Sequence, residues 1–130
     1  MSIEITEIDH VNVTVPKTAE EAAKHFYSFV LGLKEIPKPE GSRVSVGAWY
    51  QLAGVQLHLS LEDGVGDIGA SGRHVCLMVA DLARAEQQLR DAGVEILPDE
   101  RPVRGWLRFY VRDPGGNLIE IARREIFEHA

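Results

Sequence analysis

Two similar segments decide the fold of this chain: IDHVNVTV at residues 8–15 and GRHVCLMV at residues 72–79. Aligning them places His10 over His74, an offset of 64 residues. In the first segment, valines alternate with His10 and polar residues, which is typical of a strand with one buried face. A pattern that recurs at a long, fixed offset indicates an internal repeat.

Two further matches follow in the same order. GLKEI at 32–36 lies over GVEIL at 93–97, and QLHLS at 56–60 lies over LIEIA at 118–122, at offsets of 61 and 62 residues. The last match places His58 over Glu120. Two copies of one module are therefore expected.

Each copy has the pattern of a strand, a helix and three further strands. In the first, Thr18, Glu20 and Glu21 begin a helix that ends at Gly32. Its apolar residues are Ala22, Ala23, Phe26, Phe29 and Val30. The predicted strands cover 8–15, 34–36, 43–52 and 55–61.

The second copy repeats this order. Its helix is predicted over 82–92 with a stop at Gly93, and its strands over 74–79, 94–97, 107–112 and 117–123, with a turn at 113–116. The fold class is therefore α+β, with two paired βαβββ modules. We expect a single domain over 1–130: module one at 5–62, a linker at 63–72, module two at 73–124 and a tail at 125–130.

Composition narrows the classes of function. The 130 residues are 45% hydrophobic and 26% charged, as in ordinary globular proteins. The net charge of −6 argues against nucleic acid as a partner, and no apolar run is long enough to cross a membrane. With the acidic start MSIEITEIDH and a single cysteine, Cys76, we expect a cytoplasmic protein without an internal disulfide.

Four ionisable residues stand at repeat-equivalent positions on apolar strands. Strand alternation places His10, His58, His74 and Glu120 on the face opposite the aliphatic residues. Imidazole and carboxylate suit Zn, Ni, Fe or Mn, and two histidines with one carboxylate is the arrangement of non-haem iron sites. For any one histidine a structural hydrogen bond is the commoner role; the repeat is what favours a metal site.

Other ionisable residues have simpler interpretations. A carboxylate such as Glu120 between isoleucines needs a metal ion, an arginine or solvent to compensate its charge. His25 and His129 are interpreted as structural or solvated. Cys76 is interpreted as a small residue that fills the core or a cavity.

From Ile5 to Arg124 the chain resembles the vicinal oxygen chelate superfamily, which includes glyoxalase I, extradiol dioxygenases, fosfomycin-resistance proteins and bleomycin-binding proteins. The likeness rests on DHVNVTV, FVLGLKE, GRHVCLMV and VRDPGGNLIEI, the last similar to the DPxG turn that precedes the family's glutamate ligand. It implies a glyoxalase-like, partly open barrel lined with metal ligands.

The resemblance also implies roles for single residues. The family's metal positions fall on His10, His58, His74 and Glu120, which would hold one divalent ion (Zn, Ni, Fe or Mn). Glyoxalase I usually has glutamate where this chain has His58. Three roles are therefore open for His58: metal ligand, base or substrate contact. Glu120 is a candidate for ligand and base together.

Substrate-binding residues are expected on the same face. In the fosfomycin-resistance branch a tyrosine three residues before the DPxG aspartate faces the substrate, and here that position is Tyr110. Strand alternation adds Arg108 and Trp106, although Arg108 is equally consistent with a solvated charge. In the first module either Trp49 or Tyr50 is expected to line the pocket, and we predict that Trp49 binds the substrate.

These residues predict a metal-dependent enzyme of the glyoxalase type. Its metal ion would chelate vicinal oxygens of a small-molecule substrate for lyase or isomerase chemistry. The alternatives are an Fe(II) extradiol-type dioxygenase, an enzyme that opens an epoxide on a phosphonate, and a non-catalytic drug-binding protein of the bleomycin-resistance type. The modules pair within one chain or between two, and we expect a homodimer.

Overall fold

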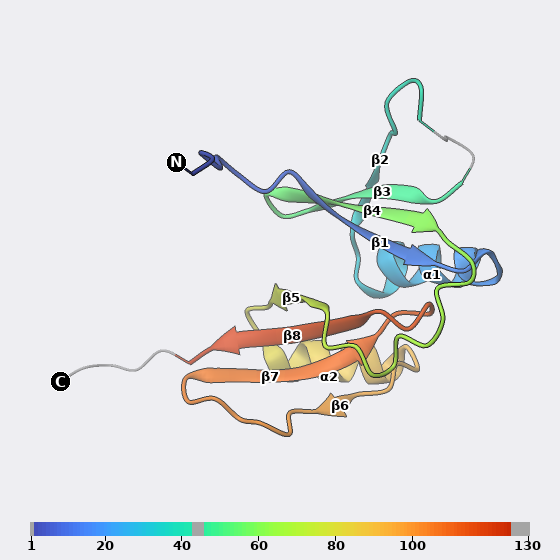
Figure 1. Ribbon diagram of the computed structural model, residues 1–130. Coiled ribbons are helices and arrows are strands. Elements are labelled where there is room, and N and C mark those ends of the chain that lie inside the picture. The colour runs from blue at the N-terminus through green and yellow to red at the C-terminus, as the bar shows by residue number, and fades with distance from the viewer. Residues whose placement is uncertain (1, 43–45, 126–130) are drawn as a thin grey trace. The chain divides into compact units, whose positions relative to one another are not determined.

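The computed structural model describes residues 2–42 and 46–125. The chain forms two compact units, Met1–Val65 and Gly66–Ala130. Each unit contains one four-stranded sheet with helical segments (Figure 1). The two units have the same order of elements, which confirms the α+β class with a repeated βαβββ module.

The first unit begins with strand β1. Its elements are β1 (His10–Val15), the 3₁₀ helix η1 (Lys17–Ala19), α1 (Glu20–His25), the π-helix η2 (Phe26–Val30), β2 (Lys34–Ile36), β3 (Ala48–Leu52) and β4 (Val55–Leu61). The sheet has the order β1-β4-β3-β2, with β1 parallel to β4 and the other pairs antiparallel. The register pairs Asn12 with His58 and His58 with Trp49.

The second unit repeats this plan. Its elements are β5 (His74–Met78), α2 (Leu82–Asp91), β6 (Leu97–Pro98), β7 (Trp106–Arg112) and β8 (Leu118–Arg124), in the sheet order β5-β8-β7-β6. Again the first and last strands are parallel. The register pairs Cys76 with Glu120 and Glu120 with Tyr110. Neither sheet closes on itself, because each ends in two different edge strands.

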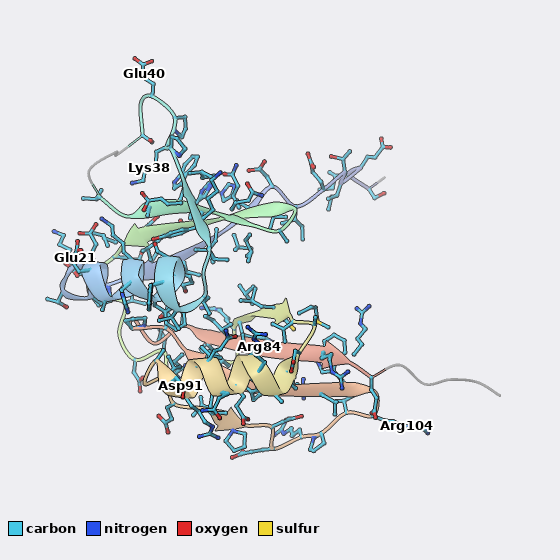
Figure 2. All side chains as sticks on the ribbon, turned by 180° about the vertical axis from the view of Figure 1, so that it is seen from behind. Glu21, Lys38, Glu40, Arg84, Asp91 and Arg104 are labelled. Atoms are coloured by element: carbon cyan, nitrogen blue, oxygen red, sulfur yellow. The ribbon has the colours of Figure 1, made fainter. Side chains whose placement is uncertain are left out.

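Alternation along the strands produces the core of each unit. In the first unit Leu57 and Leu59 of β4 are buried together with Val15, Tyr27 and Tyr50. In the second unit the corresponding buried residues are Phe109, Val111, Ile119, Ile121 and, on α2, Leu89. The exposed side of α2 carries charged side chains such as Arg84 and Asp91 (Figure 2).

The buried face of the first helix differs from the prediction. Ala23 and Phe26 are buried as expected, but Phe29 is 75% exposed and Tyr27, which the prediction omitted, is 1% exposed. The cause is the π-helix over Phe26–Val30: its wider turn changes the angular spacing, so an ordinary helical period misplaces its residues. The helix stops are confirmed, since Gly32 and Gly93 have φ of 71° and 80°.

Some strand boundaries also differ. The strand expected over 94–97 is reduced to Leu97–Pro98, and the one expected over 43–52 begins at Ala48, with residues 43–45 outside the described part.

The predicted turn at 113–116 is present. There the Asp113 carboxylate accepts hydrogen bonds from the backbone N–H groups of Gly115 and Asn117, both at 2.9 Å. This turn places Leu118 at the start of β8.

Candidate functional site

In the first unit, three aromatic rings form a stack on the face of the sheet opposite the core. The ring of His58 lies between His10 and Trp49, with centroid separations of 4.0 and 3.7 Å and interplanar angles of 16° and 5°. Register explains this placement, because Trp49 of β3 lies directly opposite His58 of β4. Of the two candidate aromatics, Trp49 therefore shares the face of His58, whereas Tyr50 is buried in the core and pairs with Ser28.

Hydrogen bonds fix which nitrogen of each stacked histidine is available. His10 Nδ1 donates to Asp9 Oδ2 at 2.8 Å, so Nε2 is its unprotonated nitrogen when the ring is neutral. His58 Nε2 donates to Gln56 Oε1 at 2.9 Å, which leaves Nδ1 as the acceptor. Burial first, and then the nearby His10 charge, lower the pKa of His58, so its neutral form is favoured.

The stack limits what His10 and His58 can do together. A metal ion lies close to the plane of an imidazole that binds it, about 2.0–2.1 Å from the nitrogen. Two nearly parallel rings separated by 4.0 Å have no such point in common. In the observed conformation one ion can therefore bind His10 or His58, but not both.

In the second unit, the candidate site is organised around Glu120 of β8. Its side chain is buried although it lies between Ile119 and Ile121, and its charge is compensated within the unit. Trp106 Nε1 donates to Oε2 at 2.6 Å and Cys76 Sγ donates to the same oxygen at 3.3 Å. The other oxygen, Oε1, lies 3.1 Å from His74 Nε2 and 3.6 Å from Arg108 Nη1.

These contacts keep Glu120 ionised. Burial opposes the charge, but the hydrogen bonds from Trp106 and Cys76, together with the electrostatic effect of the nearby Arg108 and His74, lower its pKa below the usual value. The sequence-based expectation that metal, arginine or solvent must compensate this carboxylate is met in part by Arg108. Proximity to Glu120 raises the pKa of Tyr110 after the larger effect of burial.

The pair formed by His74 and Glu120 has the spacing of two ligands on one ion. His74 Nδ1 donates to the carbonyl oxygen of Gly72 at 2.8 Å, so Nε2 faces the carboxylate. When the ring is neutral, Nε2 and Oε1 are both acceptors, and they require a proton or a cation between them. Ligand atoms about 2.0–2.2 Å from one ion lie roughly 3–3.4 Å apart, and the observed separation is 3.1 Å.

Arg108 is held in place on the same face. Its Nε donates to Asp99 Oδ2 at 3.0 Å and its Nη2 to the carbonyl oxygen of Arg101 at 3.0 Å. The hydrogen bond to Asp99 is the main cause of a raised pKa for Arg108. Its guanidinium carbon lies 5.6 Å from the centre of the Tyr110 ring. Arg108 is thus an anchored side chain and not a solvated charge.

Cys76 does not fill the core, so that part of its interpretation as a core or cavity filler is wrong. Cys76 is exposed and lies on the face of β5 that carries His74, directly opposite Glu120 in the register. Although the residue as a whole is exposed, its thiol is partly desolvated where it meets Glu120. This desolvation and the hydrogen bond to Glu120 raise the pKa of Cys76 to about 11, so the thiol is a neutral donor at physiological pH. Its contact with Glu120 could not be read from the sequence, because it depends on the pairing of strands 44 residues apart.

The predicted site residues thus fall into two groups. His10, His58 and Trp49 lie together in the first unit; His74, Glu120, Trp106, Arg108 and Tyr110 lie together in the second. Among residues 2–42 and 46–125, no three His, Cys, Asp or Glu side chains gather as a group that could hold a metal ion. His25 stacks on Phe29 in the helical segment of the first unit, and His129 lies outside the described residues.

Within the described residues, no helix is long and apolar enough to cross a membrane.

Comparisons with known proteins agree with the repeated fold. A glyoxalase family model, described as the Glyoxalase/Bleomycin resistance protein/Dioxygenase superfamily, matches residues 7–121. A crystal structure described as a glyoxalase family protein from Bacillus anthracis is 35% identical, covers 96% of this chain and 100% of its own, and has a TM-score of 0.82.

More distant structures share the fold. Lactoylglutathione lyase from Agrobacterium tumefaciens is 21% identical over 92% of this chain and 95% of its own, with a TM-score of 0.68. The fosfomycin resistance protein FosX from Listeria monocytogenes is 17% identical over 95% of this chain and 97% of its own, with a TM-score of 0.75. No curated protein sequence is significantly similar to the chain. The family match over most of the chain shows that it belongs to the Glyoxalase/Bleomycin resistance protein/Dioxygenase superfamily.

Proposed function

We propose that the protein is a metal-dependent enzyme of the glyoxalase type that chelates vicinal oxygens of a small molecule and catalyses lyase or isomerase chemistry. The observation that carries the proposal is the separation of 3.1 Å between His74 Nε2 and Glu120 Oε1, which suits two ligands of one divalent ion. His74 Nδ1 is fixed by a backbone carbonyl, which is typical of histidines that bind metals.

The proposed ligands are His10, His74 and Glu120. His10 supports this set because its Nδ1 is anchored by Asp9, as the Nδ1 of its repeat equivalent His74 is anchored by Gly72. His10 belongs to the first unit, whereas His74 and Glu120 belong to the second, so the proposal includes pairing of the two kinds of module, within one chain or in a homodimer. Zn, Ni, Fe or Mn suits these donors, and when bound it would act as a Lewis acid toward substrate oxygens.

His58 is assigned the role of proton acceptor. To become a fourth ligand, its ring would have to leave the stack with His10 and Trp49. In the stacked position its Nδ1 accepts a proton, while Gln56 holds Nε2 in the donor form. The lowered pKa of His58 favours the neutral ring that a general base needs.

Arg108 and Tyr110 are proposed to orient the substrate. Asp99 and Arg101 hold the Arg108 guanidinium near the proposed ligand Glu120, where it can donate to an anionic oxygen. Burial, followed by the charge of Glu120, raises the pKa of Tyr110, so its hydroxyl keeps its proton and can donate as well. Trp49 contributes a flat apolar surface next to His58.

The test is reconstitution of chelator-treated protein with Zn, Ni, Fe(II) or Mn, followed by assays of hemithioacetal isomerisation. We expect activity with at least one ion, a large loss in His10→Gln, and wild-type activity in His25→Gln. The second is the matched control, because His25 contacts Phe29 in the helical region instead of the site. Oxygen uptake with a catechol and Fe(II) would favour the dioxygenase instead. Tight binding of a cationic drug by metal-free protein, without turnover under any condition, would contradict the enzyme proposal.

A further inference from the structure

The two carboxylate oxygens of Glu120 have different surroundings. Oε2 accepts hydrogen bonds from Trp106 Nε1 at 2.6 Å and from Cys76 Sγ at 3.3 Å. Oε1 receives neither of these hydrogen bonds. It lies 3.1 Å from His74 Nε2 and 3.6 Å from Arg108 Nη1. The carboxylate is thus oriented with one oxygen occupied by neutral donors and the other directed toward the candidate ligand His74.

Both donors are themselves held in place. Trp106 begins β7, where its backbone N–H donates to the carbonyl oxygen of Val103 at 3.0 Å, and the Arg124 guanidinium carbon lies 5.2 Å from its ring centre. Cys76 lies directly opposite Glu120 in the parallel pairing of β5 with β8. The indole N–H and the thiol therefore approach Oε2 from β7 and β5, the two strands that flank β8.

We propose that Trp106 and Cys76 are positioning residues that make Glu120 a one-oxygen ligand and thereby select a small divalent transition ion over calcium. The inference rests on the proposed metal-dependent function. It gives Trp106 the role of holding the Glu120 carboxylate, whereas the sequence predicted that Trp106 contacts the substrate. A one-oxygen carboxylate suits ions that take four to six ligands. Calcium takes six to eight oxygens and often binds both oxygens of a carboxylate, which these two donors prevent.

The chemistry of the donors predicts effects of different size. The indole N–H is a strong donor to an ionised oxygen, and partners that orient a metal ligand are typically worth about 10- to 100-fold in affinity. The thiol is a weak donor, so its loss should cost about two- to tenfold. A serine at the same position would restore a donor with a hydroxyl group.

The experiment is calorimetric titration of the full, chelator-treated chain with Co²⁺ and separately with Ca²⁺. The variants are Trp106→Phe, Cys76→Ala and Cys76→Ser. Tyr50→Phe is the matched control, since it removes a hydrogen-bonding group from a buried aromatic residue of the core that pairs with Ser28. Visible absorption of bound Co²⁺ reports the coordination geometry independently of activity.

We expect Trp106→Phe to lose about 10- to 100-fold in Co²⁺ affinity without a comparable loss for Ca²⁺. Its Co²⁺ spectrum should shift, whereas Tyr50→Phe should bind as wild type. Cys76→Ala should lose less, and Cys76→Ser should recover. Equal losses for both ions would indicate general destabilisation and overturn the inference, as would wild-type Co²⁺ binding by both Trp106→Phe and Cys76→Ala.

If Trp106→Phe does not fold, the comparison of Cys76→Ala with Cys76→Ser decides, because Cys76 is exposed and its replacement disturbs little packing.

Two results separate this inference from the proposed function. If the wild-type chain binds no divalent ion, the proposed function itself fails. If it binds Co²⁺ but the variants do so equally well, only the positioning role fails.

Discussion

Replacement of Asp113 by alanine should destabilise the protein through the turn that begins β8. The Asp113 side chain is buried and accepts hydrogen bonds from the backbone N–H groups of Gly115 and Asn117, both at 2.9 Å, and from Asn117 Nδ2 at 2.8 Å. Alanine leaves the two backbone donors without this partner. Each such loss costs about 1–3 kcal/mol when the group is buried.

The expected size follows from the partial exposure of the turn. Gly115 and Asn117 are only half-buried, so water can replace part of each lost bond. We therefore expect a loss of about 2–3 kcal/mol in the free energy of unfolding, or roughly 6–15 °C in melting temperature. Asp113→Asn keeps one accepting oxygen and should lose about 1 kcal/mol.

Urea unfolding of each variant provides the measurement. The matched control is Asp67→Ala, because Asp67 Oδ1 also accepts from a backbone N–H, that of Gly69 at 2.8 Å, but in an exposed loop and with a single bond. We expect a change of about 0.5 kcal/mol or less there. If Asp113→Ala is as stable as Asp67→Ala, the reasoning about the turn is refuted.

Two further predictions concern the first unit. Gly47 has φ of 67° and an added Cβ would meet the carbonyl oxygen of Leu59, so Gly47→Ala should cost about 3 kcal/mol or more in urea unfolding. Gly64 has a similar φ of 75° but open space around it, so Gly64→Ala should cost only about 1–2 kcal/mol; equal effects would contradict the role of the close contact. For Glu20, the hydrogen bond from Gly47 N–H is the main cause of a pKa below the ordinary 4.5, so its stabilisation is complete above that pH and is lost as the pH falls through the lower folded value. The stability difference between wild type and Glu20→Gln, measured across a pH series, should shrink below 4.5 and should not grow.

The repeat and the strand alternation could be predicted because both depend on short-range pattern. Alternation correctly placed Glu120 on the face opposite Ile119 and Ile121, and it placed Trp106 and Arg108 on the face of Glu120. These residues are close in sequence or joined by one hairpin. Their relative positions therefore follow from strand geometry alone.

The remaining features depend on information that the local pattern lacks. The contact of Cys76 with Glu120 depends on the register of a parallel pair joined by a long crossover. Trp49 and Tyr50 are both aromatic, and only the packing of Tyr50 with Tyr27 and Ser28 separates the core residue from the site residue. The π-helix over Phe26–Val30 changed the buried face of a helix whose residues have ordinary helical periodicity.

The most direct test of the metal-dependent account is the metal content of untagged protein, measured by elemental mass spectrometry in wild type and Glu120→Gln. This variant keeps the size of the side chain and an oxygen for Trp106, but it removes the negative charge next to His74. The account predicts about one divalent ion per chain in wild type, with a melting temperature that falls after chelation, and neither property in Glu120→Gln. A wild-type protein that contains no metal, takes up none on reconstitution and melts at the same temperature throughout would contradict it.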